Sequence, residues 1–219
     1  MHKEEKTLSV SYNPEQGKVD FTQFKHFKEL SQFSFDVDRI HDEYQKLIEK
    51  VPLDPITNQI CLTHTLKDYD KGSLFYEGCG SLTYAWSKDP YNEDGSLNKR
   101  KEQLVESDFT EFNDEIKSSY LFEVYETLSK YFILGRFRFF KLAPKKCMGW
   151  HSDTEPRIHI PVITDPGCKI VIENESVHLP ASGFVYHCDT EKFHTALNGS
   201  HKCNRIHLVA GLVGKKPST

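Results

Sequence analysis

The sequence predicts a mainly β fold with flanking helices, built as a β-sandwich or jelly roll. After about Arg136, apolar residues alternate with a period of two in short segments separated by turn signals. Before residue 130, two segments show a helical apolar period instead. The 219 residues suit a single domain over 1–219. We expect a mixed α/β portion with flanking helices over 1–130 and a jelly-roll core over 131–214.

Two amphipathic helices are predicted in the first part of the chain. Residues 35–51 begin at a candidate N-cap, Asp36 or Asp38, and continue with apolar residues at helical spacing. Residues 108–132 repeat apolar residues at four-residue steps. Between them, turn formers and charges over 88–102 predict a solvated loop, with a lid over a site as the alternative.

Seven short segments predict the strands of the core. They are bounded by turn signals such as "TDPG" and "PASG", a spacing typical of antiparallel sandwiches and jelly rolls. The expected strands are residues 136–142, 157–163, 168–173, 176–179, 183–187, 193–197 and 204–213.

Composition and charge narrow the class of protein. The chain is 37% hydrophobic and 27% charged, as globular proteins are, and its formal charge of −4 offers no basic surface for nucleic acid. No apolar run approaches the roughly 20 residues of a membrane helix, and the first residues lack a signal-peptide stretch. We therefore expect a soluble, cytoplasmic protein without nucleic-acid or membrane partners. The six cysteines form no CxxC pair, so we expect reduced and mostly buried thiols.

An Arg-Ile-His triplet occurs twice, in "RIHIPV" and in "RIHLVA". Alternation places Arg157 and His159 on one face of the first strand, and Arg205 and His207 on one face of the second, with aliphatic residues on the opposite faces. These polar faces either line a site or meet water, and the two strands alone leave both interpretations open.

His151 and Asp153 lie two residues apart, just before the first of these strands. In extended chain the side chains at i and i+2 point the same way, so an imidazole and a carboxylate can bind one ion. His194, at the start of another predicted strand, offers a third ligand. Two His and one carboxylate leave one face of an octahedral ion open, as in non-heme Fe(II) oxygenases.

Two other pairs of His and acid compete with this assignment. His41 and Glu43 lie inside a predicted helix, where residues i and i+2 diverge by roughly 200°, which excludes them. His187 and Asp189 are followed by only 30 residues, which makes a third ligand from across a sandwich awkward. The pair that begins at His151 is therefore favoured.

Arg205 opens the last long predicted strand, 11 residues after His194. A dicarboxylate cosubstrate that chelates iron through its 2-oxo acid end would extend its far carboxylate between the strands. The fork of an arginine binds such a carboxylate through two charge-assisted hydrogen bonds. An arginine that only covers the rim of the barrel is the alternative.

Three runs, "GWHSDTEPRIHIPVITDPGC", "LPASGFVYHCDTEKFHTALNGS" and "NRIHLV", resemble the aspartyl/asparaginyl β-hydroxylase family of Fe(II)- and 2-oxoglutarate-dependent oxygenases, which includes proline hydroxylases. The resemblance covers residues 130–213 and implies a double-stranded β-helix, the cupin-like jelly roll. It implies dioxygen-dependent hydroxylation of a C–H bond in an amino-acid or peptidyl residue, with release of succinate and CO₂. Some animal members lack the carboxylate ligand, whereas this chain supplies Asp153, which favours hydroxylation over halogenation.

The same resemblance implies roles for individual residues. His151 and His194 would be the imidazole ligands of the iron, and Arg205 would hold the distal carboxylate of 2-oxoglutarate. His159 would approach the 1-carboxylate of 2-oxoglutarate. Arg157 corresponds to a position that contacts an acidic substrate in some members.

For several residues near the motifs, a structural role is the simpler interpretation. His178, His187 and His201 are expected to be ordinary strand or turn residues, and His207 receives no role. Four aromatic residues near the motifs are candidates for pocket walls, with core packing as the alternative: Phe140, Trp150, Tyr186 and Phe193.

Two other classes of function stay open beside the oxygenase. One is a cupin-like metal enzyme that does not use 2-oxoglutarate, which would leave Arg205 without a partner. The other is a non-catalytic binding module on the same fold, because fold does not fix function.

Overall fold

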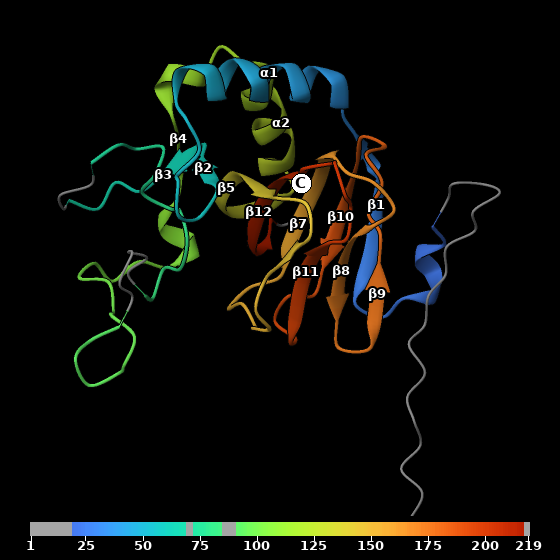
Figure 1. The fold of residues 1–219 in the computed structure, drawn as a ribbon. Helices are drawn as coiled ribbons and strands as arrows, with labels where there is room; N and C mark the ends of the chain where they lie inside the picture. Colours follow the sequence, from blue (N-terminus) through green and yellow to red (C-terminus); the bar gives the residue numbers. More distant parts are fainter. Residues whose placement is uncertain (1–18, 69–71, 85–90, 217–219) are drawn as a thin grey trace, which may run out of the picture.

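The segments with alternating apolar residues form two antiparallel sheets that pack face to face (Figure 1). The computed structural model describes residues 19–68, 72–84 and 91–216. The larger sheet has six strands in the order β1-β10-β7-β12-β5-β2, and the smaller has four in the order β6-β11-β8-β9. A third sheet consists of β3 and β4. The prediction of a mainly β fold with flanking helices is confirmed.

The elements run as follows along the chain. They are the 3-10 turn η1 (Phe21–Gln23), β1 (Phe27–Ser34), α1 (Val37–Lys50), β2 (Gln59–Cys61), β3 (Thr63–His64), η2 (Glu106–Asp108), β4 (Glu111–Phe112), η3 (Asp114–Ile116), α2 (Tyr120–Ser129), β5 (Phe132–Leu142), β6 (Lys146–Cys147), β7 (Arg157–Ile163), β8 (Cys168–Ile172), β9 (Glu175–Val177), β10 (Phe184–Cys188), β11 (His194–Asn198) and β12 (Arg205–Lys215).

The helix predicted from residue 36 is present as α1. The Asp36 side chain accepts a hydrogen bond of 3.1 Å from the Arg39 amide and so caps the helix. The face with Ile40, Tyr44 and Leu47 is buried, and the ring of Tyr44 lies 4.9 Å from that of Phe139 in β5. Figure 1 shows α1 and α2 on the other side of the six-stranded sheet from β8, β9 and β11.

The helix predicted over 108–132 is wrong for its first half, because α2 begins only at Tyr120. Phe112 fits the helical period, but it pairs with Thr63 in the β3–β4 sheet. The Asn113 amide donates to the Leu62 carbonyl at 2.8 Å, and the Asn113 side chain accepts from the Glu115 amide at 3.1 Å. These contacts satisfy the backbone in a non-helical path, so tertiary pairing overrides the local apolar period.

The six-stranded sheet also takes strands from the first 130 residues. β1 pairs with β10, and β2 pairs with β5. The sheet therefore extends beyond the predicted core over 131–214.

The alternation predicted for β7 and β12 is present, but both faces are buried. Ile158, Leu208 and the other aliphatic residues pack in the cluster beneath α1 and α2. On the opposite face Arg157, His159 and Arg205 are only 4%, 7% and 1% exposed. The interpretation that this polar face meets water is therefore wrong.

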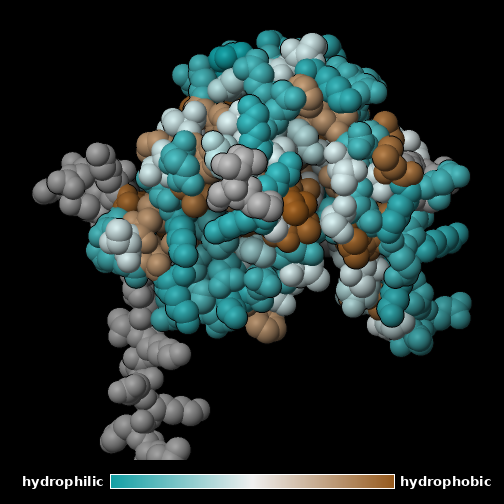
Figure 2. All heavy atoms as spheres, turned by 180° about the vertical axis from the view of Figure 1, so that it is seen from behind, coloured by the Kyte–Doolittle hydropathy of each residue, from teal (hydrophilic) through white to brown (hydrophobic). Residues whose placement is uncertain are grey.

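The hydropathy of the surface and the state of the cysteines are as expected for a folded globular chain. The side seen in Figure 2 is mostly hydrophilic, and its apolar residues form small separate groups. Four of the six cysteines are buried and all six are free thiols, as predicted. Within the described ranges, none of the helices is both long and apolar enough to cross a bilayer.

Candidate metal centre

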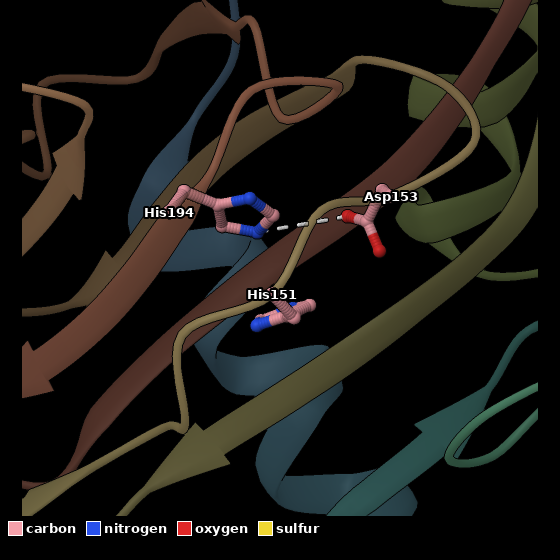
Figure 3. A group of neighbouring side chains, drawn as sticks. All are labelled: His151, Asp153 and His194. Atoms are coloured by element: carbon pink, nitrogen blue, oxygen red, sulfur yellow. Dashed lines mark ion pairs between the residues drawn. The ribbon is translucent and has the colours of Figure 1, made fainter.

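His151, Asp153 and His194 converge on one point (Figure 3). One ligand atom from each residue lies within 4.8 Å of the others, so the three side chains could hold a metal ion. The Asp153 Oδ2 and His194 Nε2 atoms are 3.8 Å apart, and the two imidazole centroids are 4.2 Å apart. The predicted convergence of these residues is present in the structure.

Backbone hydrogen bonds bring the two ligand segments together. The His151 amide donates to the His194 carbonyl at 3.1 Å, and the His194 amide donates back to the His151 carbonyl at 2.8 Å. The Asp153 amide donates to the Thr190 carbonyl at 2.8 Å. This pairing fixes the segment before β7 against the start of β11, which is why residues 41 to 43 positions apart in sequence meet.

Hydrogen bonds also orient the two imidazoles. His151 Nδ1 lies 2.8 Å from the Gly149 carbonyl oxygen, and His194 Nδ1 lies 3.0 Å from that of Lys192. A carbonyl only accepts, so each Nδ1 carries the proton and each Nε2 keeps its lone pair. Burial lowers the pKa of His194, which keeps this ring neutral. The donor set therefore fits a metal of the two-His-one-carboxylate class.

Asp153 is held as a carboxylate by Arg157. Burial alone would raise the pKa of Asp153, but the charge of Arg157 and its hydrogen bond, aided by His194, lower that pKa to about 2. Arg157 Nε donates to Asp153 Oδ2 at 2.9 Å. A second partner that orients a ligand carboxylate is typical of metal sites.

Behind Arg157 lies a carboxylate that the sequence did not reveal. Glu106 is 1% exposed and pairs with Nη1 of Arg157 and, at 2.6 Å, with Nη2 of Arg136. Burial opposes its ionisation, but the charges of these two arginines lower the pKa of Glu106 far below its ordinary value. A Cβ at Gly135 or at Gly211 would lie 2.6 Å from the Glu106 carboxylate, so glycine is needed at both positions.

Arg205 is buried, and a histidine accepts a hydrogen bond from its guanidinium. Its Nη2 donates to His207 Nδ1 at 3.1 Å, and His207 Nδ1 lies 3.4 Å from His159 Nδ1. Among the ion pairs of the described residues, none involves Arg205. Burial lowers the pKa of Arg205 to about 10, and burial together with the Arg205 charge holds the pKa of His159 well below its ordinary value. His207, to which no role was assigned, connects the two residues predicted to bind the cosubstrate.

Arg157, predicted to contact an acidic substrate, already engages two carboxylates, those of Asp153 and Glu106. A third anion would compete with these partners. The substrate role of Arg157 stays a prediction.

The rival pair does not form a metal cluster in the part of the chain that the structure describes. Asp189 Oδ2 accepts a hydrogen bond of 3.0 Å from His26 Nδ1. His187 lies in β10, paired with Ile158 of β7. His41 lies on the surface of α1, where its Nε2 is 3.0 Å from the Gln45 amide nitrogen.

Replacing His187 with alanine is therefore expected to leave the iron content of the protein unchanged, because its ring lies outside the triad. Metal analysis after anaerobic loading with Fe(II) measures this content. Iron loss in His187→Ala would show that the wrong pair was chosen.

The four candidate wall residues differ in their burial. Trp150 and Phe193 are 57% and 61% exposed, each next to a ligand in sequence. Tyr186 is fully buried against Phe21 and donates or accepts a hydrogen bond of 2.7 Å with Ser182, so it belongs to the core. Phe140 is half-buried.

The loop predicted over 88–102 is only partly described, because residues 88–90 lie outside the described ranges. Over 91–102 the chain turns back on itself, and Arg100 Nη2 donates to the Glu77 carbonyl at 3.1 Å. The next carbonyl, that of Gly78, accepts from Arg136 and Arg138. The lid remains a prediction.

Comparison with known proteins adds no family assignment. No protein-family model matches the chain, and no curated protein is significantly similar to it in sequence. The family resemblance therefore rests on the sequence motifs alone.

Proposed function

We propose that this protein is an Fe(II)- and 2-oxoglutarate-dependent dioxygenase of the aspartyl/asparaginyl β-hydroxylase type, which hydroxylates a C–H bond of an amino-acid or peptidyl residue. The observation that carries the proposal is Arg205, a guanidinium that is 1% exposed and has no carboxylate partner among the described residues. An isolated buried charge is costly. A dicarboxylate ligand would supply the missing anion on the sheet face that also carries His159.

The strand order supports a jelly roll for the catalytic core. From β5 to β12 the chain places β5, β7, β10 and β12 in the larger sheet, and β6, β8, β9 and β11 in the smaller one. The chain thus crosses repeatedly between two facing antiparallel sheets, as double-sheet jelly rolls do. The metal triad lies at the junction of the two sheets, because Asp153 precedes β7 and His194 begins β11.

His151, Asp153 and His194 would hold the iron and leave one face of it open to ligands. Bound iron, with 2-oxoglutarate and dioxygen, supplies the oxidising chemistry that hydroxylates the substrate and yields succinate and CO₂. The protein's own part is to fix these ligands and to keep Asp153 ionised through Arg157.

Arg205 would bind the distal carboxylate of 2-oxoglutarate through its planar fork. His159 would approach the 1-carboxylate as a neutral hydrogen-bond donor, because its pKa lies well below the ordinary value. His207 accepts from Arg205 and so limits the orientation of the guanidinium. Arg205 and His207 are each 1% exposed, so water is excluded and their electrostatic interactions are strengthened.

The test is iron binding followed by turnover. Wild-type protein loaded with Fe(II) under nitrogen should bind about one iron per chain, and it should form succinate from 2-oxoglutarate when air and ascorbate are supplied with a panel of amino acids and peptides. The matched variants are His194→Ala, which should lose the iron, and His187→Ala, which should keep it.

Absence of iron binding in the wild type would contradict the proposal and favour a binding module. Iron binding without 2-oxoglutarate binding would favour the cupin-like alternative.

A further inference from the structure

Arg138 of β5 is a second buried guanidinium without a carboxylate of its own. It is 8% exposed, its Nη1 donates to the Gly78 carbonyl at 3.2 Å, and its Nε has no hydrogen-bond partner. In the described part of the chain, the ion pairs include none with Arg138. The buried carboxylate nearby, Glu106, hydrogen-bonds to Arg136 and Arg157 instead.

The sheet register places Arg138 on the face of the metal site. Arg138 pairs with Val209 of β12, and Val209 pairs with His159 of β7, so the three residues form one row across neighbouring strands. Side chains in such a row project from the same face.

Arg138 and Arg205 occupy different places on this face. Arg205 pairs with Leu142, four residues along β5 from Arg138, which corresponds to roughly 13 Å in a strand. One dicarboxylate bound at the metal and at Arg205 would therefore leave Arg138 unneutralised. Besides Arg157, which is paired with Asp153 and Glu106, the face holds two separate cationic positions, one on each side of the row that contains Phe140 and His207.

Stability alone does not account for Arg138. Glu106 forms its hydrogen-bonded pairs with Arg136 and Arg157, so a third guanidinium beside them adds repulsion and desolvation. In β2, Arg138 pairs with Cys61, whose thiol is fully buried and lies 3.9 Å from the Cys79 thiol. Burial opposes thiolate formation there, whereas the hydrogen bond with Cys79 and, after it, the charges of Arg138 and Arg136 lower the pKa of Cys61.

We propose that Arg138 binds a carboxylate of the substrate, so that the hydroxylated molecule carries a free carboxylate. This inference rests on the proposed function for the reaction, but the binding of a carboxylate by Arg138 does not require turnover. The carboxylate belongs either to the α-carboxyl group of a free amino acid or to an acidic side chain within a peptide.

The probes are the twenty L-amino acids and their α-carboxamides, together with N-acetylated, C-amidated peptides containing Asp or Glu and their Asn or Gln counterparts. Calorimetry measures binding to Fe(II)-loaded, anaerobic protein saturated with 2-oxoglutarate. The titrations are repeated on metal-free Arg205→Met protein, in which carboxylates cannot bind at Arg205 and neither iron nor 2-oxoglutarate is needed.

We expect at least one acid to bind and its amide to bind at least about 30-fold more weakly, since an unpaired buried charge costs about 2 kcal/mol or more. Arg138→Met should abolish this preference, Arg138→Lys should restore part of it, and the exposed Arg39→Met should keep it. Cys61→Ala should also keep it. Preference for the free acids identifies an α-carboxylate, and preference for the capped acidic peptides identifies a side-chain carboxylate.

Thermal unfolding of the metal-free protein separates this role from a structural one. Arg138→Met should melt at the same or a higher temperature, because it removes an unneutralised buried charge. Equal binding of acids and amides in both protein states, an unchanged preference in Arg138→Met, or a melting temperature lowered as far as in Glu106→Gln would each overturn the proposal. Failure of succinate formation with an intact acid preference would instead count against the oxygenase reaction alone.

Discussion

Replacing Arg205 with methionine is expected to weaken the binding of 2-oxoglutarate at least about 30-fold, because removing one partner of a buried, hydrogen-bonded charge pair costs about 2–5 kcal/mol. Iron binding should change little, because Arg205 contacts His207 and none of the three metal-site side chains in the hydrogen bonds of the described residues. The metal-free variant should be as stable as the wild type or more so. A methionine fills the buried volume of the arginine without its desolvation penalty.

Calorimetric titration of anaerobic Fe(II)-loaded protein with 2-oxoglutarate gives the affinity, and metal analysis gives the iron content. Arg39→Met is the control, since Arg39 lies on the surface of α1 with its guanidinium over the Tyr120 ring. Equal losses of iron and of 2-oxoglutarate in Arg205→Met would contradict the assigned role. A fall in the melting temperature of the metal-free variant would indicate that Arg205 serves the fold.

The ligand triad was predictable because each ligand lies in a segment whose local pattern is visible in the sequence. His151 and Asp153 are two residues apart in extended chain, and His194 opens a strand whose alternation is visible in the sequence. The alternation in "RIHIPV" and "RIHLVA" also identified the polar face that carries Arg157, His159 and Arg205. In each of these segments, short-range pattern and tertiary structure agree.

Glu106 could not be predicted in the same way. Its partners Arg136 and Arg157 lie 30 and 51 residues away, and nothing around Glu106 distinguishes it from an exposed loop acid. The alternation of Arg136 and Arg138 in an otherwise apolar strand was the available signal, because buried arginines need an anion. That signal indicates that a carboxylate exists but not where it lies in the sequence.

The misplaced helix start has a similar cause. Phe112 follows the helical period of the α2 segment, yet it pairs with Thr63 of β3 as a strand residue. Strand β2 is only three residues long, which is too short for an alternating pattern to be visible. It forms because it pairs with the edge of β5. Such long-range pairings decide the path of the chain where local preference is weak.

Replacing Glu106 with glutamine should destabilise the protein by about 3–5 kcal/mol at pH 7, because breaking a buried pair leaves charge uncompensated. Arg136 and Arg157 would both lose their shared anion. Since the folded-state pKa of Glu106 lies far below its ordinary value, its contribution to stability is full above about pH 5 and declines as the pH falls below that. The difference in stability between wild type and variant should therefore shrink between pH 5 and pH 3.

Urea denaturation at pH 7, 5, 4 and 3 measures the free energy of unfolding for both proteins. The control is Glu123→Gln, whose carboxylate is 63% exposed and lies 3.7 Å from Arg39. We expect it to lose no more than about 1 kcal/mol at any of these pH values. If Glu106→Gln were as stable as the control, or if its deficit stayed constant down to pH 3, the two arginines would not lower the pKa of the buried carboxylate. Glu106 would then not be the anion that helps to hold Arg157 beside Asp153. The low pKa of Asp153 would need another cause.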